Sequence, residues 1–434
     1  MRAKIWPSLG LALLLLTGTT APAAEPKLQD APPPPAGFPK FVWQEIDASL
    51  KIGYAVILED LNGDKKPDII VVDQHKIVWY ENPTWKKRVI LDGKTKPDNV
   101  CICALDIDGD GDLELVVGAG WKPFDTKNPG TLQWLKRGKT IDDTWDDYAI
   151  PCDEPTVHRI RAIDLDGDGR KEIVLAPLMG REATQAANWT DGRPVRILSY
   201  KVPATPHKPE SWKPTVLSEE LHVVHNFAPF TPPGAKKPMS LMTASYEGYS
   251  AIILGANGTK TQTSLTHEAN QANPKSNRGS SEIKPGTLLK TSQGGGIDRS
   301  TGAVVATVEP WHGNEIVVYT GPSGKKPTRQ VLDNHLRWGH AVSFGDLDGD
   351  GADELVIGVR DNPAKDDKFT EKRGVRLYRS ADSTGEKWDR YILEDGGVAV
   401  EDLAVGDLNG DGRPDIVAVG RATGNCRIYW NQGR

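Results

Sequence analysis

Short apolar runs recur along the chain, and their length is typical of strands rather than helices. Runs such as Ile69–Val72, Leu115–Val117 and Ile416–Val419 are rich in branched aliphatic residues, which suit a pleated, half-buried surface. Each run directly follows a polar segment that contains glycine and several carboxylates. The pattern predicts an all-β protein built from many short antiparallel strands.

The polar segment before each run follows one nine-residue pattern, which occurs five times. Oxygen-bearing side chains occupy its first, third, fifth and ninth positions, and glycine always occupies the fourth, where a tight turn needs it. Ca²⁺ and Mg²⁺ prefer such oxygen ligands, so we expect up to five Ca²⁺ (or Mg²⁺) sites. Their predicted ligands are Asp60, Asn62, Asp64 and Asp68; Asp106, Asp108, Asp110 and Glu114; Asp164, Asp166, Asp168 and Glu172; Asp346, Asp348, Asp350 and Glu354; and Asp407, Asn409, Asp411 and Asp415.

The spacing of these acidic loops gives the number of repeats. Their first residues are 46, 58, 182 and 61 residues apart. The long interval is about three times the last one, so two repeats without the acidic loop are expected between Asp164 and Asp346. Seven repeats of this length, each with several short strands, predict a seven-bladed β-propeller. The last repeat ends after its third strand, and residues 41–46 are expected to supply its fourth strand and close the ring.

The N-terminal segment is expected to lie outside the propeller. Residues 1–24 combine a basic start, the short apolar run 9–16 and the small-residue site Ala21–Ala23, a pattern typical of a secretory signal peptide. We therefore expect an exported protein, periplasmic or secreted, with a proline-rich linker over 25–40 and the propeller over 41–434. An interfacial anchor helix is the alternative for the apolar run, which is too short to span a membrane.

The charge of the chain argues against one class of function, nucleic-acid binding. The chain has 53 basic and 59 acidic residues, with a net charge of −6, so it lacks the basic footprint of a nucleic-acid-binding protein. We expect no membrane span and no nucleic-acid partner, and the sequence leaves the oligomeric state open.

Cys101 and Cys103 are expected to share one strand face, and Cys152 and Cys426 lie far apart in sequence. All four are interpreted as buried thiols, with a pairing of Cys152 or Cys426 left open.

Candidate chemistry gathers on the face opposite the acidic loops. In a propeller, the turns between second and third strands share one face with the residues that lead into each first strand. His158 and His340 each lie six residues before an acidic loop, and either His222 or His225 begins the fourth blade. His312 and Glu247 lie in the corresponding turns of the two atypical blades. Other positions expected on this face are Trp121, Arg181, Arg360, Glu401 and Arg421.

These histidines have two interpretations. Neutral imidazole suits Zn²⁺ or another transition metal, and three ligands with an open position form a catalytic arrangement. Alternatively, each histidine only fills the channel or makes hydrogen bonds there.

The motifs resemble two known families. The acidic loops, with Phe344-Gly345-Asp346 and Val405-Gly406-Asp407, resemble FG-GAP or VCBS repeats of integrin α-type propellers. The atypical blades are similar to the propeller domain of aldos-2-ulose dehydratase (1,5-anhydrofructose dehydratase). That resemblance rests on Val157-His158-Arg159, on 243–248, on 279–283, on 306–315 and on Gly339-His340.

The second resemblance implies divalent ions in the propeller loops and a zinc-assisted site that dehydrates keto sugars. In that family cupin domains follow and are linked to a second, isomerising step, which this chain is not expected to perform because it ends at the propeller.

This chemistry gives each candidate residue a role. The expected activity is a hydro-lyase reaction that eliminates water from a small keto sugar of the 1,5-anhydrofructose or aldos-2-ulose type. We hypothesise His225, His312 and His340 as ligands of Zn²⁺ or another transition metal, with Glu247 as a fourth ligand or catalytic group. His158 is the candidate acid/base, and Trp121 and Arg360 would hold the sugar. The alternatives are a non-catalytic, calcium-stabilised propeller that binds carbohydrate or protein, and a propeller-type polysaccharide lyase.

Overall fold

A computed structural model describes the chain over residues 28–232, 234–268, 278–291, 297–321, 326–336, 338–360 and 373–434, without the side chains of 289–302. The expected signal peptide lies outside these residues. Within them, no helix is long and apolar enough to cross a membrane. The only helices of the described chain are the 3₁₀ turns η1 (Gln185–Ala187) and η2 (Pro209–Ser211).

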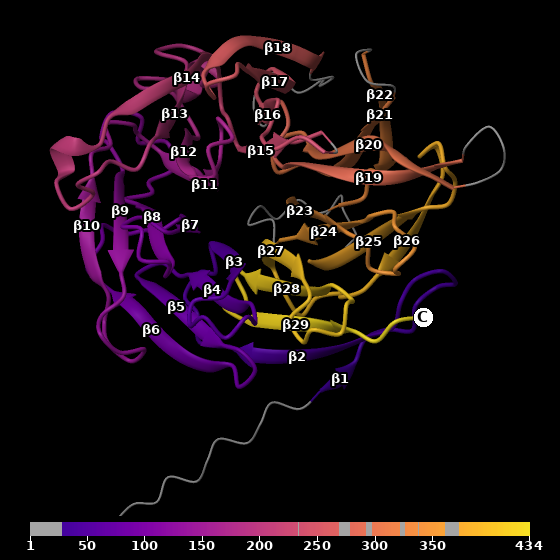
Figure 1. The fold of residues 1–434 in the computed structure, drawn as a ribbon. Coiled ribbons are helices and arrows are strands. Elements are labelled where there is room, and N and C mark those ends of the chain that lie inside the picture. The colour runs from indigo at the N-terminus through magenta and orange to yellow at the C-terminus, as the bar shows by residue number, and fades with distance from the viewer. Residues whose placement is uncertain are drawn as a thin grey trace, which may run out of the picture.

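The described strands form seven antiparallel sheets, which Figure 1 shows arranged around one central axis. The structure therefore confirms the predicted all-β fold, a seven-bladed β-propeller. In chain order the first three blades are β3 (Ala55–Glu59), β4 (Asp68–Val72), β5 (Lys76–Glu81) and β6 (Lys86–Asp92); β7 (Cys101–Leu105), β8 (Glu114–Ala119), β9 (Thr131–Lys136) and β10 (Asp146–Ile150); and β11 (Val157–Ile163), β12 (Glu172–Pro177), β13 (Val195–Tyr200) and β14 (Pro214–Leu221).

The next two blades are the two that sequence spacing predicts without an acidic loop. They consist of β15 (Asn226–Phe230), β16 (Ser240–Ser245), β17 (Gly248–Leu254) and β18 (Lys260–Glu268), and of β19 (Ile283–Thr291), β20 (Ile297–Glu309), β21 (Glu315–Thr320) and β22 (Thr328–Asp333). The sixth blade consists of β23 (Gly339–Gly345), β24 (Glu354–Val359), β25 (Gly374–Ser380) and β26 (Trp388–Ile392).

The last blade joins the two ends of the chain. It contains β27 (Val400–Gly406), β28 (Asp415–Gly420) and β29 (Cys426–Asn431), and β2 (Phe41–Asp47) pairs antiparallel with β29 as its fourth strand. Trp43 lies opposite Tyr429, and Figure 1 shows β2 running beside β29. The predicted closure by an N-terminal strand is therefore confirmed.

The described part of the expected linker, from residue 28 onward, lies along the propeller rather than apart from it. β1 (Gln29–Asp30) pairs with β2 as a fifth strand. Phe38 is buried, with its ring 5.6 Å from that of Tyr391. Sequence reasoning missed this packing because a proline-rich composition has no periodic pattern to show it.

Burial of the second strands explains the unbroken apolar runs. Every residue of β4, β8, β12, β24 and β28 is buried. Each of these strands has a neighbouring blade on both faces of its sheet, so apolar side chains are needed on both sides. By contrast, the outer strand β6 has several exposed positions, as expected of an edge that faces solvent.

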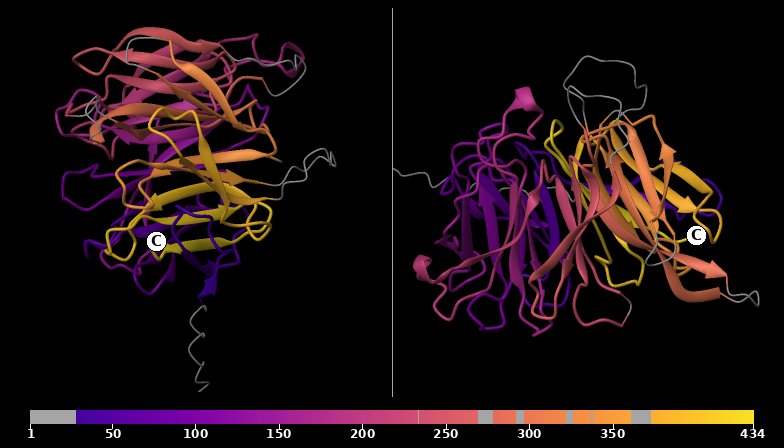
Figure 2. Two further views of the ribbon diagram at one scale, coloured as in Figure 1. Left: turned by 90° about the vertical axis from the view of Figure 1, so that its right-hand side faces the viewer. Right: turned by 90° about the horizontal axis from the view of Figure 1, so that it is seen from above.

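The acidic loops connect first to second strands, and they therefore lie on the opposite face from the turns between second and third strands. The two side views in Figure 2 show strands running between these faces. The fourth-position glycines have φ values of 75° to 80°, a left-handed conformation that residues with a Cβ adopt only at a cost. They are Gly63, Gly109, Gly167, Gly349 and Gly410.

Candidate functional site

A cavity of about 310 Å³ lies on the face opposite the acidic loops. Six of the residues predicted for this face as metal, catalytic or substrate-binding groups line it: Trp121, His158, His225, His312, His340 and Arg360. Glu401 and Arg421, expected on the same face, line it too. These residues come from several blades, so the cavity forms only when the ring is assembled.

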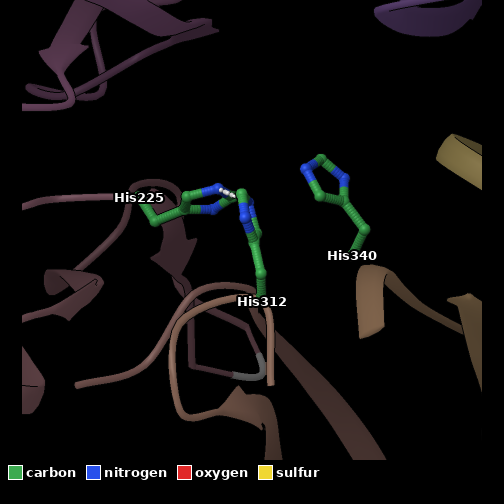
Figure 3. A group of neighbouring side chains, drawn as sticks. All are labelled: His225, His312 and His340. Atoms are coloured by element: carbon green, nitrogen blue, oxygen red, sulfur yellow. Dashed lines mark hydrogen bonds between the residues drawn. The ribbon is translucent and has the colours of Figure 1, made fainter. Parts of the chain in front are cut away.

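Three imidazoles from three blades converge in this cavity. His225 immediately precedes β15, His312 lies in the turn between β20 and β21, and His340 is the second residue of β23. One ring nitrogen from each lies within 4.8 Å of the others. The Nε2 atoms of His225 and His312 are 2.8 Å apart, and a dashed line joins these two residues in Figure 3. The structure therefore brings together the three residues that the sequence predicts as transition-metal ligands.

A shared irregularity directs side chains from the first strands into the cavity. The pairing register shifts at His158 in β11, at His340 in β23 and at Glu401 in β27, each being the second residue of its strand. Such a bulge leaves one residue unpaired and re-aims its side chain. The equal spacing of these residues from their acidic loops thus has a structural cause.

In two of the three histidines, His225 and His340, the other ring nitrogen, Nδ1, has a partner outside the cluster. Nδ1 of His225 lies 3.0 Å from Oε1 of Glu282 and 3.2 Å from the Ser281 carbonyl oxygen. Nδ1 of His340 donates to the carbonyl oxygen of Glu401. Such partners fix ring orientation and leave Nε2 facing the site, as in many metal centres.

The electrostatics keep the imidazoles neutral. Burial, and then the positive charge of Arg360, lower the pKa of His312 and of His340 well below 6.5. Burial also lowers the pKa of His225. Burial raises the pKa of Glu282, but Arg159 and His225 outweigh it, so the pKa of that carboxyl lies below its usual value. At neutral pH the cluster therefore offers unprotonated nitrogens, the form that binds metals.

His158 lies beside the three imidazoles but is not part of the cluster. Its ring centroid is 4.7 Å from that of His225, and its Nδ1 is 3.0 Å from the His225 carbonyl oxygen. Donation from Nδ1 leaves a lone pair on Nε2, which faces Nη1 of Arg159 at 3.3 Å. Burial, and then Arg159, lower the pKa of His158 well below 6.5. A neutral ring with this lone pair can accept a proton from a substrate that takes the place of Arg159.

Glu247 does not join the three imidazoles. Its Oε1 lies 2.7 Å from Nδ1 of His222, and its Oε2 accepts a hydrogen bond from Ser245 at 2.8 Å. His222 is thereby engaged with Glu247, and His225 is the histidine that enters the cavity. Sequence spacing alone left these two histidines undistinguished, because they lie only three residues apart in an irregular lead into β15.

Aromatic and cationic side chains surround the open side of the cluster. The Trp121 ring centroid is 5.0 Å from that of His158. The guanidinium of Arg360 lies 4.7 Å from the Trp338 ring centroid and donates to Glu401 at 2.9 Å. Among the described residues, Nε of Arg360 and Nε1 of Trp311 are buried without a hydrogen-bond partner. Aromatic faces beside unpaired donors suit a small polyhydroxylated ligand.

Several cavity residues were not assigned a role by sequence reasoning. Phe124 and Trp189 stack with their rings 5.1 Å apart, and both line the cavity. Tyr54 also lines it, and donates to Asp98 at 2.8 Å. These residues lie in long irregular connections or just before first strands, where no periodic signal marks them.

The acidic loops gather carboxylates on the opposite face. In three of them, one oxygen from each of the first, third and ninth positions lies within 4.8 Å of the others: Asp106, Asp108 and Glu114; Asp164, Asp166 and Glu172; and Asp346, Asp348 and Glu354. The fifth-position residues are not part of these groups. The other two loops have Asn62 and Asn409 at the third position, and no such three-carboxylate group is found there among the described residues.

The chemistry of these loops fits a cation. The ninth-position carboxylates are buried, and burial raises the pKa of Glu354 to about 8 and that of Glu114 to about 7. Oδ1 of Asp108 and Oδ1 of Asp346 are buried without a hydrogen-bond partner among the described residues. Crowded, desolvated carboxylates with free oxygens are stabilised by a bound hard cation.

Comparison with known proteins supports the two resemblances. Residues 60–117 and 366–418 match the FG-GAP-like repeat, and residues 129–322 match the β-propeller domain of aldos-2-ulose dehydratase. Aldos-2-ulose dehydratase of Phanerodontia chrysosporium is 23% identical over 281 residues, covering 60% of this chain and 29% of the relative. The aligned region thus spans less than a third of that relative.

Solved structures are similar to this chain at low sequence identity. A chain in the crystal structure of a mitotic checkpoint complex is 10% identical with a TM-score of 0.51, over 98% of this chain and 99% of that one. A chain from a complex of BBS1N with ARL6DN is 13% identical with a TM-score of 0.48, over 94% and 98%. The chain is therefore a β-propeller with FG-GAP-like repeats, and a central segment of it is similar to the propeller domain of aldos-2-ulose dehydratase.

Proposed function

We propose that this protein is a metal-dependent hydro-lyase that eliminates water from a small keto sugar, of the aldos-2-ulose or 1,5-anhydrofructose type. The observation that carries the proposal is the convergence of His225, His312 and His340 in a cavity with aromatic walls. The similarity of residues 129–322 to a dehydratase propeller domain supports it, and that segment includes His225 and His312.

The three imidazoles suit Zn²⁺ or another transition metal with an open coordination position. Such a metal supplies Lewis acidity toward a carbonyl oxygen. Elimination then requires two proton movements. A base takes the proton from the carbon next to the carbonyl, and the departing β-hydroxyl receives a proton and leaves as water. In this proposal Nε2 of His158 takes the first proton and delivers it to the leaving oxygen.

The surrounding residues position the sugar. The Trp121 ring offers an apolar face, and the unpaired Nε of Arg360 is available to a sugar oxygen. Glu401 holds Arg360 at 2.9 Å and Arg421 at 3.0 Å. This shared carboxylate fixes both guanidinium groups at the wall of the cavity.

Metal analysis and turnover together test the proposal. We expect about one transition-metal ion per purified chain after dialysis against a weak chelator. We also expect the protein to convert 1,5-anhydrofructose or an aldos-2-ulose to an unsaturated product, seen by ultraviolet absorbance and mass spectrometry. A chain that holds only Ca²⁺ and leaves both sugars unchanged would instead be a binding propeller.

Substitution of His158 with alanine tests its role in proton transfer. We expect the turnover rate to fall by about 10²- to 10⁴-fold, the usual contribution of a general acid–base group, while the transition-metal content stays unchanged. The measurement is kcat with saturating sugar, alongside elemental analysis. Full activity in His158→Ala would remove this residue from the mechanism.

Calcium removal tests the acidic loops. We propose that they bind Ca²⁺ and brace the blades, so EGTA is expected to lower Tm. One site filled at 100 times its Kd contributes about 2.7 kcal/mol. The double variant Asp164→Asn, Asp166→Asn should lose one Ca²⁺ per chain and part of the EGTA effect. If Tm is the same with Ca²⁺ and with EGTA, the loops are acidic turns without a structural ion.

A further inference from the structure

A second cavity lies on the propeller axis, next to the one that holds the histidines. It has a volume of about 320 Å³ and is lined by the innermost strands of six blades: β3, β7, β11, β19, β23 and β27. Arg159 lines both cavities, so its side chain lies between them. The second cavity, called the axial cavity below, has no part in the chemistry proposed above.

Cationic side chains face one another in the axial cavity. Arg161 on β11 and Lys284 on β19 line it, with Arg159 at its inner end. The positive charge of Arg161, and then burial, lower the pKa of Lys284 to about 7. The largest influence on the pKa of this lysine is therefore repulsion by Arg161, which lines the same cavity.

The acidic groups offset these cations only in part. Glu282 is engaged by Arg159 at 3.3 Å and by the His225 ring at 3.0 Å. Asp402 lines the cavity, where its Oδ2 accepts a hydrogen bond from the backbone of Val56 at 3.0 Å, and burial raises its pKa. Glu59 also lines the cavity. Three cationic side chains thus line the cavity against two carboxylates.

The two central cations keep donors free. Arg161 donates from Nε to the Phe227 carbonyl oxygen at 2.7 Å and from Nη2 to Asn226 at 2.8 Å. Its Nη1 has no hydrogen bond to a described residue. Lys284 likewise makes no hydrogen bond or ion pair within the described part of the chain. A fixed guanidinium and an unpaired ammonium in one cavity form the usual recognition set for a small oxyanion.

We propose that the axial cavity binds a small oxyanion, held by the free nitrogens of Arg161 and Lys284. Such an anion would relieve the repulsion between the two cations, and its negative charge would lie close to Arg159, beside the histidine cavity. An inorganic ion and an acidic monosaccharide present the same oxyanion chemistry, so both are tested as ligands.

Isothermal titration calorimetry of the full chain with sulfate, phosphate and glucuronate tests the proposal. We expect saturable binding of at least one of these anions at one site per chain. Whichever anion binds most tightly indicates the source of the ligand. Binding is expected to weaken about tenfold in Lys284→Met, the loss of one charge-assisted hydrogen bond. It should strengthen in Asp402→Asn, which removes the opposing carboxylate.

A matched lysine controls for general salt effects, because sulfate also stabilises proteins by exclusion from their surface. Lys76→Met removes a lysine whose side chain is 44% exposed on β5, and it should bind like the wild type.

Without anion, Lys284→Met is expected to have a higher Tm than the wild type, because it removes the repulsion from Arg161. If Lys284→Met does not fold, Lys284→Gln takes its place. The proposal is overturned if none of the anions binds the wild type saturably, or if the Lys284 variant binds them as tightly as Lys76→Met does.

Discussion

Replacing His340 with alanine is expected to empty the transition-metal site and to abolish dehydratase activity. His340 supplies one of three imidazoles within 4.8 Å of one another, and two remaining nitrogens cannot complete a three-histidine site. A metal contributes several kcal/mol of charge stabilisation to such a reaction, so we expect a loss of at least ~10³-fold in kcat/KM. Elemental analysis and a product assay on the same preparation measure both effects.

The control for this substitution is a histidine outside the cavity. His335 has a side chain that is 70% exposed, and His335→Ala should retain metal and activity. If His340→Ala keeps its transition metal, the cluster is not the metal site. If the variant loses the metal but keeps its activity, the metal is not part of the chemistry.

Deleting residues 28–47 is expected to destroy the cooperative stability of the propeller. The deletion removes β2, exposes the edge of β29, and takes away Phe41, a core residue that is 4% exposed. Loss of one buried Phe side chain alone costs about 3–5 kcal/mol, and a whole domain has only about 5–15 kcal/mol of stability. Urea unfolding followed by tryptophan fluorescence would report the loss.

A shorter truncation is the control that distinguishes the loss of the closing strand β2 from the loss of N-terminal residues in general. A chain that begins at Gln29 keeps both β1 and β2, and its urea midpoint should equal that of the full chain. Equal midpoints for this chain and for the longer deletion would mean that the ring holds without its closing strand.

The blade count could be predicted from sequence because the chain marks most repeats in the same way. The acidic loop fixes the start of a second strand, so the single long interval between Asp164 and Asp346 reveals two unmarked blades by arithmetic. The closing strand followed from the same logic, since the last blade would otherwise expose an edge. The packing of Phe38 against Tyr391 had no comparable signal.

Position along the chain predicts which face of the propeller each histidine lies on, but it does not predict the direction of each side chain. His158 and His340 share one distance from an acidic loop, and the structure shows that both lie at the same bulge in their strands. Glu247 was expected near the cluster because its turn is on the correct face, but its side chain pairs with His222 instead. A side-chain direction of this kind depends on tertiary contacts that no local pattern encodes.

The meeting of charged residues in the axial cavity could not be predicted from the sequence, for a different reason. Arg161 and Lys284 belong to different blades and are 123 positions apart in the chain. Each sits in an ordinary first strand, where an isolated charged residue gives no sign of its neighbour. Only the closed ring brings them together.

The pairing of β2 with β29 also has a consequence for the order in which the blades can fold. Phe41 lies opposite Asn431, so the first long strand to be synthesised must wait for nearly the last residues before it finds its partner. Contacts between such distant segments form late in folding. The other six blades are each built from consecutive strands and can form as the chain emerges. We therefore expect the ring to close last, when β2 pairs with β29, and the histidine cavity, whose residues come from several blades, to reach its final shape only at that step.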